Sequence, residues 1–86
     1  MALGRKGLSY CLQIALIEIR ATEQIKKAQA LAAVFHNVPM RLINGEPVET
    51  IVPHMLEIAE RWEVRPYIER LIDSACEKFG EETESV

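Results

Sequence analysis

The feature of this sequence that most constrains its fold is a long helix-forming stretch near the N-terminus. It begins at Leu8 or Ser9 and continues to about His36 without a glycine or a proline. Ser9 can cap the start of a helix, and Asn37 with Pro39 marks its end. A continuous helix over this stretch would hold about 28 residues and be about 42 Å long. Such a helix is long for a chain of 86 residues.

The first half of this predicted helix is apolar on two sides. One stripe, with spacings of three and four residues, continues along the whole helix and is expected to face the core. Its members are Tyr10, Ile14, Ile17, Ala21, Ile25, Ala28, Ala32 and Phe35. A second set points away from that stripe and consists of Leu8, Leu12, Ala15, Leu16 and Ile19. Because a helix that is apolar all round must be covered all round, we expect the second set to form a partner interface.

A short helical turn is expected over residues 37–45. Asn37 can cap its start. Asn44 followed by Gly45 suits a left-handed residue that ends a helix. The unusual residues of this stretch therefore have roles in stopping one helix and starting the next.

Two shorter helices make up the rest of the chain. The first is expected to start near Thr50, with Pro53 in its first turn, where proline is tolerated. The second opens at Pro66, a favoured position, and ends at Gly80. The link between them is short, so they should form an antiparallel hairpin.

The lengths of these helices do not match, because each hairpin helix is about half as long as the first helix. The first helix must therefore bend near Ala21–Thr22, or part of it must project from the hairpin. We expect an all-α fold with one long N-terminal helix packed against an antiparallel two-helix hairpin. A short helical turn lies between them, and the chain assembles into a dimeric helical bundle. Residues 1–80 should form this single domain, and the acidic residues 81–86 should be disordered.

The composition argues against several classes of protein. Two cysteines, Cys11 and Cys76, are too few for a secreted disulfide scaffold, so we expect both to be reduced and the protein to be cytoplasmic. A net charge of −3 gives no attraction to nucleic acid or to an anionic membrane. Gln13 and Glu18 interrupt the N-terminal apolar run, which is too short for a membrane span.

The polar candidates for a site are few. His36 beside Asn37 could act as an acid, a base or a ligand, but the helix dipole also favours a histidine at a helix C-terminus. His54, Glu57 and Cys76 could come together when the hairpin folds back. They could begin a zinc or iron site, which needs about four ligands, but the sequence supplies no further ones. We therefore expect no bound cofactor and no enzymatic activity.

The preferred hypothesis is a small protein–protein interaction module that homodimerises through its first helix, such as an adaptor, a regulator or an antidote-type binding protein. Another protein could also occupy the interface. One alternative is a helix-turn-helix regulator that binds nucleic acid, although the last helix carries three acidic residues against Arg70 and Lys78. A second alternative is a small enzyme or metal-binding protein that uses His54, Glu57 and Cys76.

Overall fold

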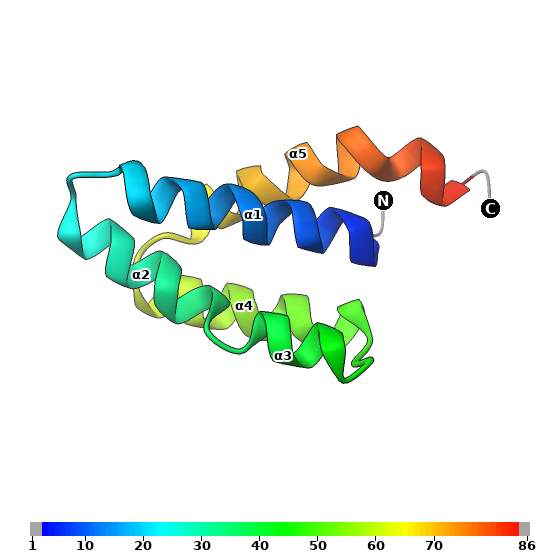
Figure 1. Cartoon of the computed structure of the whole chain (residues 1–86), viewed down its shortest axis with the longest axis horizontal. Helices are drawn as coiled ribbons and strands as arrows, with labels where there is room; N and C mark the ends of the chain where they lie inside the picture. The colour runs from blue at the N-terminus through cyan, green and yellow to red at the C-terminus, as the bar shows by residue number, and fades with distance from the viewer. Residues whose placement is uncertain (1–2, 85–86) are drawn as a thin grey trace.

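The computed structural model of the chain describes residues 3–84, with side chains up to residue 79. All regular secondary structure in this part is helical (Figure 1). The helices are α1 (Arg5–Ala21), α2 (Ile25–Phe35), α3 (Val38–Ile43), α4 (Val48–Arg61) and α5 (Arg65–Glu84). The all-α prediction is confirmed.

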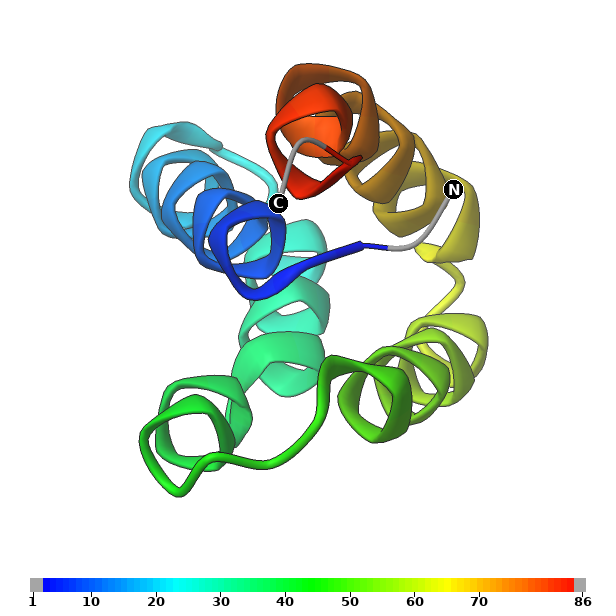
Figure 2. The ribbon, with the colours of Figure 1, turned by 90° about the vertical axis from the view of Figure 1, so that its right-hand side faces the viewer.

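The longer helices form an up-and-down bundle. α1 packs against α5 and α2, and α4 packs against α2 and α5, so the contacts run around a closed ring. Neighbouring helices of the ring run in opposite directions (Figure 1), and Figure 2 shows them from the end at which both termini lie. α3 lies at the edge of the bundle and contacts α1 and α4. The predicted hairpin and the predicted short helical turn therefore correspond to α4–α5 and α3.

The predicted long helix is broken into α1 and α2. Thr22 ends α1 with extended backbone angles (φ −75°, ψ 141°), and Gln24 is extended as well. The Gln24 N–H donates a hydrogen bond to the Thr22 Oγ1, 3.2 Å away. A threonine side chain that bonds to the backbone in this way competes with helix continuation. The prediction of a continuous helix is wrong, and the alternative of a bend near Ala21–Thr22 is correct.

Part of each apolar face of α1 has a different role from the one predicted. Leu8, Cys11 and Ala15 are fully buried, whereas Ile17 is 62% exposed and Ile25, at the start of α2, is 73% exposed. The return of α2 along α1 is the cause, because it covers the side of α1 that a straight helix would leave bare. Leu8 and Ala15, predicted to face a partner, instead lie in the core of the single chain.

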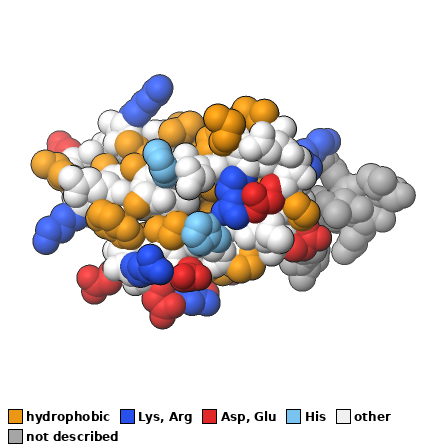
Figure 3. All heavy atoms as spheres, turned by 90° about the horizontal axis from the view of Figure 1, so that it is seen from below, with side chains coloured by type: hydrophobic (Ala, Val, Ile, Leu, Met, Phe, Trp, Pro, Cys, Tyr) orange, Lys and Arg blue, Asp and Glu red, His pale blue; other side chains and the backbone are white. Residues whose placement is uncertain are grey.

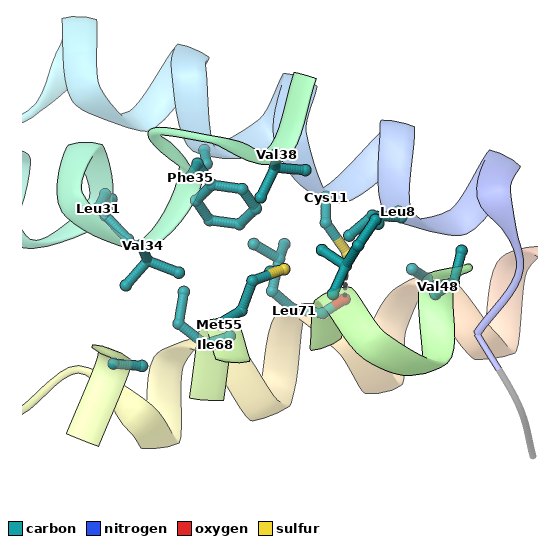
Figure 4. Close-up of a cluster of buried hydrophobic side chains, with 14 residues drawn as sticks. Leu8, Cys11, Leu31, Val34, Phe35, Val38, Val48, Met55, Ile68 and Leu71 are labelled. Atoms are coloured by element: carbon teal, nitrogen blue, oxygen red, sulfur yellow. Dashed lines mark hydrogen bonds between the residues drawn. The ribbon is translucent and has the colours of Figure 1, made fainter. Parts of the chain in front are cut away.

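The core lies along the bundle axis and is made of apolar side chains from every helix. Figure 4 shows part of it, with Leu8 and Cys11 of α1 opposite Leu71 of α5, and Phe35 of α2 close to Val38 of α3. No charged or polar side chain is buried within the described residues. The buried residues are Leu8, Cys11, Ala15, Ala30, Leu31, Val34, Phe35, Val38, Val48, Ile51, Met55, Ala59, Ile68, Leu71 and Ala75.

Gly45 provides the left-handed residue predicted at the end of α3. Its φ is 78°. Its N–H donates to the Leu42 carbonyl, and the Glu46 N–H donates to the Arg41 carbonyl. These two hydrogen bonds form a Schellman motif, in which a left-handed residue closes a helix. The predicted stop at this position is confirmed.

α4 begins earlier than predicted. It starts at Val48, after Pro47, instead of near Thr50, so Pro53 lies inside the helix and not in its first turn. A proline inside a helix leaves one carbonyl without a donor. That carbonyl belongs to Glu49, which is exposed, so water can bind it.

α5 is longer than predicted. It begins at Arg65, with Pro66 in its first turn as expected, and passes Gly80 to reach Glu84. A glycine inside a helix costs only about 1 kcal/mol relative to alanine, so it does not have to end the helix. Residues 85–86 of the predicted tail lie outside the described residues, and their disorder stays a prediction.

Glu63 occupies the left-handed position after α4, with φ 62°. The Glu63 N–H donates to the Glu60 carbonyl, and the Val64 N–H donates to the Ala59 carbonyl. Because a side chain at positive φ is strained, Glu63→Gly should raise the free energy of unfolding by about 0.5–1 kcal/mol, measured by urea denaturation. Glu77→Gly, inside α5, should lower it by about 1 kcal/mol. A Glu63→Gly variant that is less stable than the wild type would contradict this account of the turn.

Candidate functional site

The five residues predicted to contact a partner divide between the core and the surface. Leu8 and Ala15 are fully buried within the chain. Leu12 and Ile19 are partly buried and pack against the core, and Leu16 is 47% exposed. Leu12, Leu16 and Ile19 are four and three residues apart, so they share one face of α1. Part of the predicted interface therefore lies at the surface, on this face of α1.

The direction of this face follows from the neighbours of α1. On one side of the helix, the Tyr10 ring lies 5.6 Å from the Phe79 ring of α5. Helical geometry places Leu12, Leu16 and Ile19 on the other side of the buried line of α1, toward α2. The exposed part of the predicted interface therefore lies beside α2 and away from α5.

α2 adds a second apolar stripe next to the first. Ile25, Ala28 and Ala32 are three and four residues apart, and both Ile25 and Ala32 are exposed. The ion pair between Lys27 Nζ and Glu18 Oε2, 3.0 Å apart, aligns α1 with α2, and it places the two stripes at the same level along the bundle. We call the six residues the outer seam: Leu12, Leu16, Ile19, Ile25, Ala28 and Ala32.

α3 presents a separate pair of exposed apolar side chains. Met40 is 62% exposed and Ile43 is 79% exposed. The helix itself is tied to the start of α1, because the Arg5 guanidinium donates to the carbonyls of Leu42 and Glu46. The two side chains therefore project from a helix whose position is fixed.

A polar network joins α3 to the start of α4. Arg41 Nε donates to Glu46 Oε1 over 2.9 Å, and the Thr50 hydroxyl donates to Glu46 Oε2 over 2.9 Å. The hydrogen bond from Arg41, and secondly the one from Thr50, lowers the pKa of Glu46 below its usual range. Arg41 Nη1 also lies 2.8 Å from His54 Nδ1, within hydrogen-bond distance. His54 thus helps to hold the connection between the helices, and Figure 3 shows both histidines exposed on this side of the molecule.

The remaining polar candidates are not brought together. His36 at the end of α2 and Asn37 before α3 are exposed. Glu57 binds Arg61 one turn further on, with 3.1 Å between Oε1 and Nη2. Among residues 3–79, no three His, Cys, Asp or Glu side chains are grouped as a metal site needs. Within these residues of the single chain, His54, Glu57 and Cys76 therefore do not form the metal site considered for them.

The hairpin of α4 and α5 also differs from a helix-turn-helix. In that motif the two helices cross at about 90–120°, whereas α4 and α5 run antiparallel along the bundle (Figure 1). Glu69, Asp73 and Glu77 are exposed on α5. The fold therefore adds no support to the nucleic-acid alternative.

The two cysteines lie on α1 and α5 and are not joined by a disulfide. Cys11 is fully buried, and its Sγ lies 3.6 Å from the Leu71 carbonyl oxygen (Figure 4). Burial, and secondly the neighbouring Cys76 thiol, raises the pKa of Cys11 to about 12. Because the thiolate is the form that attacks electrophiles and binds metals, Cys11 is a structural residue.

One surface feature has no counterpart among the predicted sites. A shallow groove lies at the loop end, which we define as the end of the bundle holding residues 22–24 and 62–64. Its lining residues come from α2, α5 and both connections, so no single stretch of sequence signals it. They include Lys26, Lys27, Trp62, Val64, Tyr67 and Arg70.

The surface of the chain thus offers an apolar seam, an exposed pair on α3 and a groove at the loop end. No helix within residues 3–84 combines the length and the apolar character needed to cross a membrane. Comparison of the chain with family models, with curated proteins and with solved structures gave no match in any of the three.

Proposed function

We propose that this protein is a small, non-enzymatic helical interaction module that forms a homodimer through the outer seam. The observation that carries the proposal is the exposure of Leu16 and Ile25, at 47% and 73%, within two aligned apolar stripes. Large apolar side chains that adjoin one another at the surface are typical of interaction sites. A chain of this size buries a small core, so self-association would add stability that the single chain lacks.

The polar residues around the seam fit an interface of this kind. Exposed polar residues lie next to the seam residues on the surface of each helix. They are Gln13 and Arg20 on α1 and Gln29 on α2. An apolar centre with a polar rim is the usual arrangement at protein interfaces. Two copies related by a twofold axis would place the α1–α2 pair of one against that of the other, and the same residues would be used twice. Two short helices offer a small area, so we expect micromolar association.

Leu16→Glu should convert the dimer to a monomer. A charge at the centre of the seam would be desolvated without a partner, and loss of a central anchor costs about 2 kcal/mol or more, or about a 30-fold rise in the dissociation constant. The melting temperature of the dilute variant should stay near that of the wild type, because Leu16 is not a core residue. Sedimentation velocity over a concentration series measures the dissociation constant.

Gln13→Glu is the matched control, since it adds the same charge one turn earlier on the exposed rim of α1. It should leave the dissociation constant within about a factor of three, as surface substitutions usually do. A Leu16→Glu variant that keeps the wild-type mass at every concentration would remove the seam as the interface.

A further inference from the structure

The groove at the loop end has a volume of about 390 Å³ and is lined by both apolar and cationic side chains. Trp62, the residue that directly follows α4, is 46% exposed there. The turn that follows it is fixed by the left-handed Glu63 and its two backbone hydrogen bonds. The indole is therefore presented from a rigid turn and not from a loose loop.

Tyr67 and Lys27 form the opposite wall of the groove. Lys27 Nζ lies 4.8 Å from the centre of the Tyr67 ring, and it is held there by its ion pair with Glu18. A tyrosine hydroxyl is protonated at neutral pH and can donate a hydrogen bond, and burial raises the pKa of Tyr67 further. This wall combines an aromatic face with a fixed positive charge.

Lys26 and Arg70 of the groove differ from Arg61 and Arg65, two other cations near the loop end. Arg61 is paired with Glu57, and Arg65 is paired with acidic residues on α4 and α5. Within the described part of the chain, Lys26 and Arg70 have no ion-pair partner. The groove thus carries two cations that form no ion pair, alongside one acidic lining residue, Glu63, in a protein whose net charge is −3.

We propose that this groove binds a short acidic peptide segment of a partner protein, with one apolar side chain against Trp62 and Val64 and carboxylates beside Lys26 and Arg70. The charge of the groove is complementary to such a segment. Tryptophan, tyrosine and arginine are also the residues that most often carry binding energy at interfaces.

A nucleic acid fits the same groove less well. Glu63 lines the groove. Glu23, which directly precedes the lining residue Gln24, is exposed. An extended phosphate backbone would meet these charges, whereas a peptide can place one or two carboxylates between them. The inference goes beyond self-association and does not depend on it, because the groove and the outer seam share no residue.

The test uses the fluorescence of Trp62, which is the only tryptophan in the chain. The ligand is a blocked tripeptide of glutamate, phenylalanine and aspartate, and the comparison is the matched tripeptide of glutamine, phenylalanine and asparagine. The acidic peptide should give a saturable change with a millimolar or lower dissociation constant, at least about fivefold tighter than the neutral one. Its affinity should fall when salt is raised from about 0.05 M to about 0.5 M.

Arg70→Gln and Lys26→Gln should each weaken acidic-peptide binding by about two- to fivefold. Lys78→Gln is the control, because Lys78 lies over the Tyr10 ring and outside the groove. Leu16→Glu should bind as the wild type does, which separates this result from the test of the dimer. The proposal is overturned by equal binding of the two peptides, by no response to either, or by tighter binding of an oligodeoxythymidine.

Discussion

Leu8→Ala should lower the free energy of unfolding by about 2–5 kcal/mol, the range for large-to-small changes in a packed core. The Leu8 side chain is fully buried, in a cluster with Cys11 and Ala75. Removing it leaves a cavity that the neighbouring helices can fill only in part. Urea denaturation of the variant at low protein concentration, where association is negligible, measures the change.

Leu16→Ala is the matched control on the same helix. Leu16 is 47% exposed, so the same truncation should cost about 1 kcal/mol or less. Equal losses for the two variants, or a larger loss for Leu16→Ala, would show that α1 turns a different face to the core. The pair of variants therefore tests which of the two apolar faces of α1 lies inside.

The stability of the protein should fall steeply above pH 9 because of Cys11. Burial raises its pKa from 9.0 to about 12, so the native state holds this proton more tightly than the unfolded state does. The contribution is complete below pH 9 and is lost as the pH rises from 9 to 12. Linkage gives a loss of about 1 kcal/mol at pH 10 and about 3 kcal/mol at pH 11, measured as unfolding free energies across that range.

Cys11→Ala separates this effect from other alkaline titrations, including that of Tyr67, whose pKa is also raised. The variant will be less stable at pH 8, since it loses a buried sulfur, but its stability should decline less between pH 9 and pH 11. If wild type and variant lose the same free energy over this interval, Cys11 is not desolvated in the native state.

The existence of the hairpin and the stop before it could be predicted from sequence because local signals and the fold agree there, whereas the start of α4 and the end of α5 were placed wrongly. The spacing of Ile68, Leu71 and Ala75 indicates one buried face, and all three are buried. Gly45 is a residue that tolerates the left-handed conformation it adopts. Each of these inferences depends on residues within one or two turns of a helix.

The sequence indicated where a break between α1 and α2 could occur, but it did not decide whether the helix breaks there. Thr22 is neither glycine nor proline, and the surrounding residues favour helix. The straight and the bent helix make different use of the two apolar faces, and only the packing of α2 against α1 selects between them. The same choice decides that Leu8 is inside and Leu16 is at the surface.

The loop-end groove is harder still to predict, because its residues are far apart in the chain. Lys26 and Trp62 meet only after the bundle has closed. Trp62 has the spacing of a core residue in α4, and its exposure follows from its place at the end of the helix. Patterns within a helix indicate burial, but they do not indicate which surfaces two separate turns will build together.

The most direct test of the central claim, that this chain is a self-associating interaction module, is its mass in solution by light scattering over a concentration series. We expect the mass to rise with concentration from 9.8 kDa toward twice that value, and Leu16→Glu to remain at 9.8 kDa throughout. A wild-type mass that stays at 9.8 kDa up to millimolar concentration would contradict the account.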